Sequence, residues 1–504
     1  MDLVFARALL TLYYLVLGIL FVYGIHRLLL VALYYRTRAR LERSDPPPTH
    51  WPLVTVQLPL FNEMYVACRL IDAVCRFDYP PDKLEIQVLD DSTDETRHLV
   101  ADRVAHYRDL GFDIHHIHRR VRAGFKAGAL EAGVERARGE LLAVFDADFV
   151  PQPGFLRQTV PCFQDSEVGM VQARWEHINR TYSLLTRIQA IFLDGHFAIE
   201  HAARNGSGRF FNFNGTAGVW RRQAIVDAGG WHHDTLTEDL DLSYRAQLAG
   251  WRFLFRPQVA APAELPVDIN AFKGQQFRWA KGSAQTAKKL LWTILRSPIP
   301  VGVKLEAFIH LTNNMAYLLM LVLSVVVFPA MYLRRGTDPR ILLYLDLPLF
   351  LGATGSVILF YILSQRAVNP NWWREIRFIP ALMGLGIGLS VNNARAVVSG
   401  LIHRGGVFER TPKYRIEETY DDWRSKRYRA ATNLSVEVER ALAVYFSGCF
   451  VLAWQLEMWW SLPFLYLFLQ GYVYMALLSA VPDRILRAWN FRSSGADKQR
   501  AAEI

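Results

Sequence analysis

The fold is decided by Glu85-Ile-Gln-Val-Leu-Asp-Asp91 and by Leu141-Leu-Ala-Val-Phe-Asp-Ala-Asp148. In each stretch, a run of strand-forming apolar residues ends in a pair of acidic residues. Similar strand-like runs at 54–58 and 113–118 alternate with helix-like segments, which predicts a mostly parallel sheet covered by helices. Ligands bind such sheets beyond the carboxyl ends of the strands. We therefore expect an α/β domain whose ligand site brings together Asp90, Asp91, Asp146 and Asp148.

The apolar residues are distributed unevenly along the 504-residue chain. They make up 52% of it, and they concentrate in the first 35 residues and beyond about residue 300, where runs approach the ~20 residues of a membrane-spanning helix. A cleaved signal peptide is the alternative for the first run, which is longer than an ordinary signal core. The apolar run Phe378–Leu389 is short, so residues 374–400 are expected to form an interfacial or re-entrant helix. Five spans are expected, at 8–35, 304–332, 341–363, 441–459 and 462–481.

Basic residues beside the apolar runs account for the net charge of +10. Four arginines follow the first run between residues 36 and 43, which places that end in the cytoplasm. Arg334, Arg335 and Arg340 would then lie outside, against the same bias. We expect a multi-pass protein of the inner (plasma) membrane with a cytoplasmic catalytic domain. Such basic clusters meet lipid headgroups, so no nucleic-acid partner is expected. The four cysteines have no C-x-x-C spacing, which indicates reduced thiols.

These features predict seven segments. They are an N-terminal transmembrane anchor (1–45), a cytoplasmic α/β domain (46–270), interfacial helices (271–300), a transmembrane hairpin (301–365), an interfacial helix with a loop (366–435), a second transmembrane hairpin (436–482) and a cytoplasmic tail (483–504).

The acidic pairs suit a nucleotide with a divalent cation. Asp146 and Asp148 offer hard oxygen ligands that suit Mg²⁺ or Mn²⁺, which would bridge diphosphate oxygens. The alternative is a pair of solvated turn carboxylates. Asp90 and Asp91 are expected to contact the base or ribose, although Ser92 or Thr93 could make this segment a helix cap.

A basic segment follows the third strand-like run. Arg119, Arg122 and Lys126 alternate with glycines, which lets the backbone approach a phosphate closely. A solvated basic loop is the alternative. The preceding histidines, His115, His116 and His118, alternate along a strand. We expect them to lie on different faces as ordinary strand residues.

Two later motifs could carry the chemistry. Thr237-Glu-Asp239 opens an amphipathic helix, where Asp239 would be held ionised and directed outward as a general base. Glu238 and Asp241 are rival bases, and capping by Thr237 is the alternative. Gln275, Arg278 and Trp279 fit one turn of an interfacial helix. There Arg278 could serve a departing diphosphate and Trp279 a sugar ring, or both could simply anchor the helix at the interface.

A polar stripe marks the first apolar helix after the α/β domain. Glu306, His310, Asn313 and Tyr317 recur at spacings of four, three and four. Polar groups in a bilayer normally face a bundle interior or a wet path. The stripe therefore predicts the lining of a path for a hydroxyl-rich molecule.

These motifs resemble the processive inverting glycosyltransferases of family two, the cellulose synthase and hyaluronan synthase kind. The likeness is greatest to the cellulose-synthase-like A and C enzymes, which make mannan and glucan backbones. It covers residues from about 55 to 290. The motifs that carry it are Val56-Gln-Leu-Pro-Leu-Phe-Asn-Glu63, Gln87-Val-Leu-Asp-Asp-Ser-Thr-Asp94, Lys126-Ala-Gly-Ala-Leu130, Phe145-Asp-Ala-Asp-Phe149, Val171-Gln-Ala-Arg-Trp175, Phe213-Asn-Gly-Thr-Ala-Gly-Val-Trp-Arg221, Gly229-Gly-Trp231, Thr237-Glu-Asp-Leu-Asp-Leu242 and Gln275-Gln-Phe-Arg-Trp279.

The resemblance implies a GT-A-like fold and a role for each site residue. Glu63 and Asp91 would touch the nucleoside, Asp146 and Asp148 would hold the metal, and Lys126 and Arg278 would neutralise the diphosphate. Asp239 would be the base, and Trp279 would stack on the acceptor. Phe408-Glu-Arg-Thr-Pro-Lys413 resembles the family's gating loop, except that Arg410 replaces a valine.

The expected reaction transfers a hexose from a nucleotide-sugar to a growing glycan. UDP-glucose giving a β-1,4-glucan and GDP-mannose giving a β-mannan are both compatible with the motifs. A non-processive enzyme that adds one hexose to a lipid acceptor is the alternative. A transporter or a membrane scaffold would leave the acidic motifs without a use.

Overall fold

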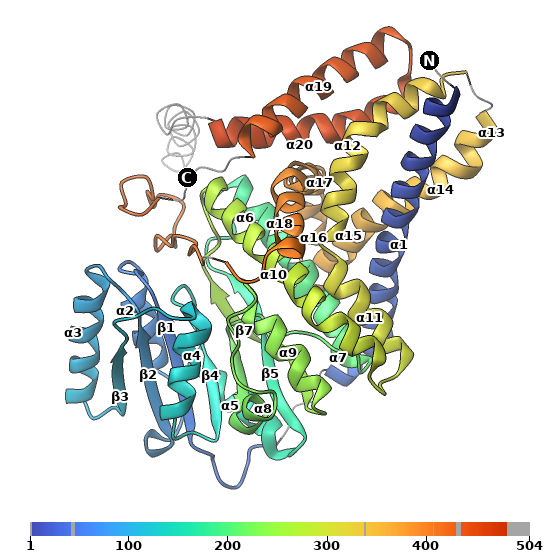
Figure 1. The fold of residues 1–504 in the computed structure, drawn as a ribbon. Helices are drawn as coiled ribbons and strands as arrows, with labels where there is room; N and C mark the ends of the chain where they lie inside the picture. Colours follow the sequence, from blue (N-terminus) through green and yellow to red (C-terminus); the bar gives the residue numbers. More distant parts are fainter. Residues whose placement is uncertain (1–2, 42–45, 337–338, 407, 430–434, 481–504) are drawn as a thin grey trace.

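The computed structural model describes residues 3–41, 46–336, 339–406, 408–429 and 435–480. An α/β domain, at the lower left of Figure 1, adjoins a bundle of long helices at the upper right. The first helix, α1 (Leu3–Leu41), runs along the bundle down to the α/β domain. The predicted tail at 483–504 lies outside the described residues.

The α/β domain is built on one seven-stranded sheet in the order β3-β2-β1-β4-β6-β5-β7. Only β6 runs antiparallel to its neighbours, so the predicted mostly parallel sheet is confirmed. The four strands expected from the sequence all form. The strands are β1 (Val54–Leu60), β2 (Leu84–Asp90), β3 (Ile114–His118), β4 (Leu141–Val144), β5 (Val168–His177), β6 (Gly218–Arg221) and β7 (Arg252–Ala263).

Helices cover both faces of the sheet and bury its apolar side chains. One core cluster joins the sheet to α2 (Ala67–Val74), α3 (Thr96–Asp109) and α5 (Phe155–Thr159). A second joins the other face to α4, α8 and α9. These last three helices span Phe125–Arg136, Arg222–Asp227 and Glu238–Leu248.

Neither predicted helix cap forms. The Ser92 hydroxyl accepts a hydrogen bond from Asn62 N at 2.8 Å, and α3 begins only at Thr96, whose N–H donates to Asp94 at 3.0 Å. The Thr237 hydroxyl instead lies 3.4 Å from that of Thr286. In both cases the hydroxyl interacts with a residue distant in sequence and so does not cap the helix.

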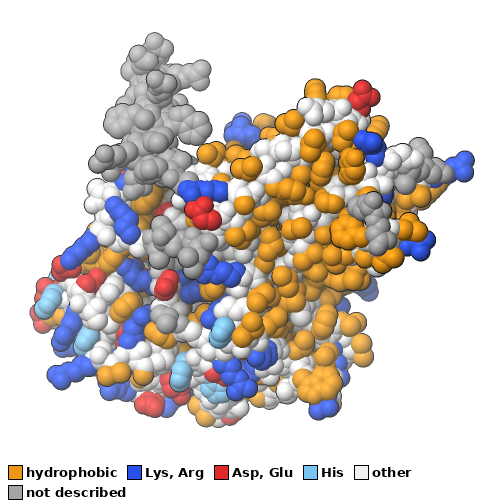
Figure 2. All heavy atoms as spheres, turned by 45° about the horizontal axis from the view of Figure 1, so that its top comes forward, with side chains coloured by type: hydrophobic (Ala, Val, Ile, Leu, Met, Phe, Trp, Pro, Cys, Tyr) orange, Lys and Arg blue, Asp and Glu red, His pale blue; other side chains and the backbone are white. Residues whose placement is uncertain are grey.

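Four helices in the described part of the chain are long and apolar enough to cross a membrane. They are Leu3–Ala39, Met315–Leu333, Leu343–Val368 and Trp459–Ser479. Figure 2 shows hydrophobic side chains gathered over the helical part and charged ones over the α/β domain. Exposed apolar residues of these helices include Leu15, Val325 and Leu477.

Two predicted spans differ from the helices observed. The segment 304–332 is divided into α11 (Val301–Thr312) and α12 (Met315–Leu333), and only the second is long and apolar enough to span. The segment 441–459 falls in α19 (Val436–Gln455), which is not among the four. Two acidic residues in its first turn lower its apolar character.

The stretch predicted as interfacial or re-entrant forms a bent pair of helices. Trp372–Gly388 and Ser390–Ile402 meet at 43°, a shape shared by broken spans and re-entrant loops. The predicted segment boundaries and sidedness remain predictions. Other helical elements include α6 (Leu184–Asp194), η3 (Gly195–His201), α7 (Ala202–Gly206), α10 (Ile269–Arg296), α15 (Ser356–Val368), α17 (Ile379–Gly388), α18 (Ser390–Ile402) and α20 (Leu462–Ala480).

The long helix α10 ties the two parts together. Asp268 caps it by accepting from the N–H groups of Asn270 and Ala271. A Cβ at Gly282 would lie 2.6 Å from the Thr237 side chain, so only glycine lets α10 approach the start of α9 this closely. Further along the bundle, Lys273 Nζ lies 2.7 Å from Glu439 of α19, and both side chains are fully buried.

We predict that Glu439→Gln destabilises the protein by about 3–5 kcal/mol, because it leaves the Lys273 ammonium buried without its carboxylate. Denaturant unfolding of purified protein would measure this change. Glu437→Gln is the matched control, since Glu437 lies in the same helical turn with an exposed side chain. A Glu439 variant as stable as the control would show that the pair does not hold α10 against α19.

Candidate active site

The predicted site residues converge on one cavity. It has a volume of about 190 Å³ and lies beyond the carboxyl ends of β1 and β4. Nine of the ten predicted site residues line it. These are Glu63, Asp91, Lys126, Asp146, Asp148, Asp239, Gln275, Arg278 and Trp279. The spatial expectation drawn from the sequence therefore holds for all of them except Asp90.

Asp90 points away from the cavity, which corrects its predicted contact with the nucleotide. Its fully buried carboxylate lies 2.9 Å from His116 Nε2 and accepts a hydrogen bond from Ser92 N at 2.9 Å. Burial alone would raise the pKa of Asp90, but these hydrogen bonds hold it below the usual value. Neighbouring residues near a strand end face opposite ways, so Asp91 faces the cavity while Asp90 does not.

Asp91 is fixed by an arginine of the predicted phosphate segment. Arg119 donates to both carboxylate oxygens, from Nε at 2.8 Å and from Nη2 at 2.6 Å. Arg122 instead stacks its guanidinium 3.5 Å from the centre of the Phe61 ring and lines the cavity. Arg119 thus pairs with the carboxylate of Asp91, whereas Arg122 packs against the aromatic ring of Phe61.

Each residue of the D-x-D pair faces a lysine ammonium group. Lys126 Nζ lies 2.5 Å from Asp146, and Lys413 Nζ lies 2.6 Å from Asp148. Burial raises the pKa of Asp146 despite its lysine. Burial would lower the pKa of Lys126, but Asp146 and Glu238 reverse this and raise it. Two carboxylates that each lie beside a cation in one cavity provide oxygen ligands that suit Mg²⁺ or Mn²⁺.

Asp239 lies in the first turn of α9 at the inner end of the cavity. Its Oδ1 accepts a hydrogen bond from Leu240 N at 2.8 Å. Burial, reinforced by the charge of Glu238, raises the pKa of Asp239 to about 7. A carboxylate with that pKa can take up a proton near neutral pH, as a general base must.

The two rival bases lie in different surroundings. Glu238 lines the same cavity, where burial raises its pKa. Asp241 is fully buried outside it, with Arg245 at 2.8 Å and Lys289 at 3.0 Å. Asp241 is thus paired with two cations away from the cavity, whereas Glu238 shares the cavity with Asp239.

The segment 408–413 lines the cavity and contacts α10. Arg278 donates to the Thr411 hydroxyl at 2.7 Å and to the Glu409 carbonyl at 2.5 Å. Burial lowers the pKa of Arg278 to about 10. Arg410, at the position where the family pattern has valine, lies 2.9 Å from Glu63. Burial raises the pKa of Glu63 to about 8 in spite of Arg410.

Other lining residues were not singled out from the sequence. Asn214 lies in a motif quoted only for the resemblance. Glu264 accepts from Tyr414 N at 2.8 Å, and its carbonyl accepts from Lys413 at 2.6 Å, so it anchors the end of the 408–413 segment. It follows β7 in a loop with no motif, and no sequence signal marks it.

A second cavity of about 370 Å³ continues from the first into the helical bundle. The two share lining residues, including Asn214, Asp239 and Trp279. Of the predicted polar stripe, His310, Asn313 and Tyr317 line this cavity. Glu306 does not line it, because its carboxylate is taken by His26 at 3.0 Å and Arg204 at 2.9 Å.

The α/β domain is similar to known proteins over most of its length. Residues 52–282 match the family model described as glycosyltransferase like family 2. The chain is 39% identical over 311 residues to glucomannan 4-beta-mannosyltransferase 1 of Oryza sativa subsp. japonica, covering 59% of each chain. It is 40% identical over 282 residues to glucomannan 4-beta-mannosyltransferase 2 of Arabidopsis thaliana, covering 54% of this chain and 53% of that one. The predicted resemblance is confirmed for this domain.

One solved structure supports the fold. A mannosyltransferase, PcManGT from Pyrobaculum calidifontis, in complex with GDP-Man and Mn²⁺, superposes with a TM-score of 0.52 at 20% identity. The match covers 77% of this chain and 99% of that one. The likeness establishes a GT-A-like arrangement of the α/β domain.

Gly215 forms part of the cavity floor, and we predict that Gly215→Ala abolishes transfer. Its φ is +79°, and an added Cβ would lie 2.9 Å from Asp239 Oδ2 and 3.3 Å from Lys126 Nζ. The left-handed backbone alone costs an alanine about 1–2 kcal/mol, and the methyl group would displace the carboxylate. Sugar transfer and thermal stability would be measured together. Gly208→Ala is the control, since its φ is +68° and an added Cβ meets nothing. Equal loss in both variants would point to backbone strain alone.

Proposed function

We propose that this protein is a membrane-embedded, inverting glycosyltransferase that polymerises mannose from GDP-mannose into a β-1,4-linked mannan. The main support is that Asp91, Asp148 and Asp239 line one cavity, which continues through Asp239 and Trp279 into a cavity between the bundle helices. The carboxylate of Asp239 would thus lie where the donor-binding cavity joins the path for the product.

The choice of donor rests on the relatives. The chain spans about half the length of the curated relatives it matches, and those quoted above are named mannosyltransferases. The superposed mannosyltransferase structure is a complex with GDP-Man. These names favour GDP-mannose over UDP-glucose, the other donor compatible with the motifs.

Asp146 and Asp148 are the residues that would hold Mg²⁺ or Mn²⁺. Their carboxylates both face the cavity. In the structure each is neutralised by a lysine ammonium, which occupies a position where a metal ion would supply the positive charge. Bound metal would supply charge neutralisation for the donor diphosphate. Lys413 would have to leave Asp148 for such binding, which couples the 408–413 segment to donor entry.

The protein's own side chains account for the transfer step. Asp239 removes the proton from an acceptor hydroxyl, and that oxygen attacks the anomeric carbon of mannose. The new C–O bond forms on the face opposite the diphosphate, whose C–O bond breaks, so the configuration inverts. Lys126 and Arg278 offset the charge that develops on the leaving diphosphate.

The second cavity favours a polymer over a single transfer. Trp279 borders both cavities, where its ring can stack on the acceptor sugar. Beyond it, His310, Asn313 and Tyr317 offer hydrogen-bonding groups to a chain that moves between apolar helices. Transfer of one hexose to a membrane lipid would need no polar path of this kind.

The orientation of the protein in the membrane follows from the distribution of basic residues and from where the nucleotide-sugar donor is supplied. The helices that can span a membrane lie on one side of the α/β domain. We place the α/β domain in the cytoplasm, where nucleotide-sugars are made, with the protein in the inner (plasma) membrane. The acceptor is the growing glycan.

A panel of labelled nucleotide-sugars tests this function. Purified protein in nanodiscs would receive GDP-mannose or UDP-glucose, with Mn²⁺, with Mg²⁺ or with a chelator. We expect a long product from GDP-mannose alone, dependent on metal and digested by a β-1,4-mannanase. A product of one hexose on lipid would establish the non-processive alternative. Absence of transfer from any donor would favour a transporter or scaffold.

The role of Asp239 predicts both a mutational and a pH effect. Asp239→Asn should bind GDP normally but transfer about 10²–10⁴-fold more slowly, the usual contribution of a general base. Because the base acts deprotonated and its pKa is raised to about 7, kcat/KM should rise with pH through 7 and level off above it. Glu238→Gln tests the alternative that Glu238 is the general base. Near-normal turnover by the Asp239 variant would contradict the assignment.

A further inference from the structure

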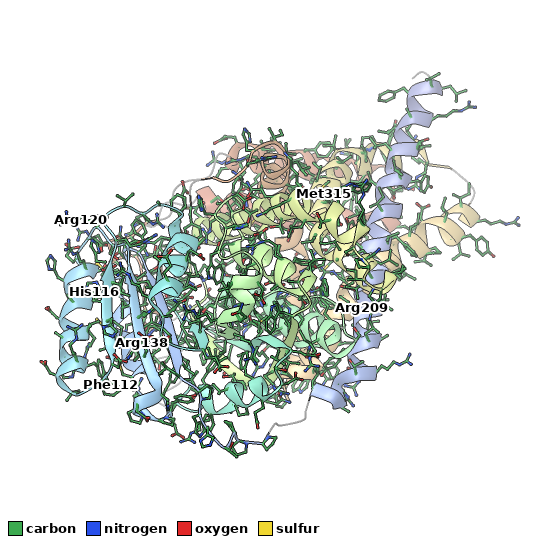
Figure 3. The ribbon with its side chains drawn as sticks, turned by 60° about the horizontal axis from the view of Figure 1, so that its bottom comes forward. Phe112, His116, Arg120, Arg138, Arg209 and Met315 are labelled. Carbon is green, nitrogen blue, oxygen red and sulfur yellow. The ribbon has the colours of Figure 1, made fainter. Side chains whose placement is uncertain are left out.

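Asp90 belongs to a cluster of metal-ligating side chains on the far side of the strand end from the sugar site. His116 Nε2 lies 2.9 Å from Asp90 Oδ2, and His118 Nδ1 lies 3.7 Å from the same oxygen. One ligand atom from each residue lies within 4.8 Å of the other two. Figure 3 places His116 near the edge of the α/β domain, far from Arg209 and Met315 on the helical side.

The sheet register builds this cluster. Asp90 and His118 are paired residues of the parallel strands β2 and β3, and His116 is paired with Val88. Side chains two residues apart on a strand share a face, so His116 and His118 both face Asp90. As expected from the alternation, the three histidines are divided between the two faces of the strand, with His116 and His118 together on one of them. His115 points the other way, to Asp113 at 2.8 Å.

One ligand atom of the cluster has no hydrogen-bond partner. His118 Nδ1 is shielded from solvent and has no hydrogen-bond partner, although its ring is directed at a buried carboxylate. A buried ring nitrogen left in this way is unfavourable. A metal ion between Asp90 and the two imidazoles would satisfy it.

No fixed cation competes for this carboxylate. Among the described residues, Asp90 forms ion pairs only with the two histidines. A second group in the described residues has ligand atoms spaced as in a metal site, but its carboxylates are paired with fixed cations. It consists of His232, Asp234 and Asp241. There Lys289 and Arg245 already neutralise the carboxylates. The Asp90 cluster is therefore the better candidate for a metal ion.

We propose that Asp90, His116 and His118 bind a divalent transition metal of the zinc class. Two imidazole nitrogens and one carboxylate oxygen are a usual protein ligand set for Zn²⁺, with water in the fourth position. Bonds of about 2.0–2.2 Å at tetrahedral angles put ligand atoms roughly 3.4 Å apart, close to the two separations to Asp90 Oδ2. The Ser92 N–H on Asp90 Oδ1 would orient the carboxylate from the second shell.

The ion would brace the wall of the nucleotide cavity. Asp90 immediately precedes Asp91, and its carbonyl accepts from Arg119 N at 3.1 Å, while the Arg119 side chain holds Asp91. Fixing Asp90 to the edge strand therefore fixes both partners of that ion pair. Metal binding itself is independent of the proposed sugar transfer.

Metal binding can be measured without any nucleotide or activity. Tag-free protein in nanodiscs would be stripped with a chelator, dialysed, and titrated with Co²⁺ by visible absorption and with Zn²⁺ by calorimetry. We expect one equivalent, with the intense visible bands of a four-coordinate Co²⁺ site, and a higher unfolding temperature with Zn²⁺. His118→Ala should lose that equivalent, and His115→Ala, on the opposite face of the same strand, should keep it.

Two further variants separate this site from its alternatives. Asp148→Ala should keep the equivalent, because the proposed donor-metal site is a different one. His118→Gln preserves side-chain bulk if the alanine variant folds poorly, and it should also lose the ion. The proposal is overturned if the stripped wild type takes up no Co²⁺ or Zn²⁺ at micromolar concentrations. It is equally overturned if the folded His118 variants bind as the wild type does.

Discussion

The site depends on the compensation of buried negative charge. Asp146, Asp148, Glu63 and Asp91 each lie within 3 Å of a lysine or arginine group in the structure. Carboxylates this close to one another would otherwise repel, and burying them without partners would be costly. The cations come from three parts of the chain, the basic segment after β3, the start of α4 and the segment 408–413. Charge balance therefore holds the loop, the sheet and the helices together around one cavity.

The same arrangement links the two parts of the molecule. The helix α10 carries Arg278 and Trp279 to the cavity, while Gly282 lets it approach the start of α9 and Lys273 fixes its other face to the bundle. Asp239, the proposed base, and Trp279, the proposed sugar-stacking residue, thus lie on helices that pack directly against one another. A rigid scaffold of this kind is what accurate placement of reacting groups requires.

Much of the fold and site could be predicted from local sequence. The strands that precede Asp91 and Asp148 are marked by apolar runs followed by acids, and parallel strands bring such ends together. The reversal of β6 and the contact at Glu264 could not be predicted, because both arise from long-range packing. Asp90 was misassigned since adjacent residues look equivalent in sequence but face opposite ways. The division of the segment 304–332 into two helices was missed because Asn313, at the break, fits the spacing of a polar stripe along one continuous helix.

The shared boundary of the two cavities has a directional consequence. In the proposed reaction, the hydroxyl beside Asp239 belongs to the sugar that was added last, and the remainder of the product extends away through the bundle. Each addition would then occur at the non-reducing end, and the oldest sugar would emerge first. Elongation itself would push the product by one residue per cycle, so no separate motor would be needed to move it outward.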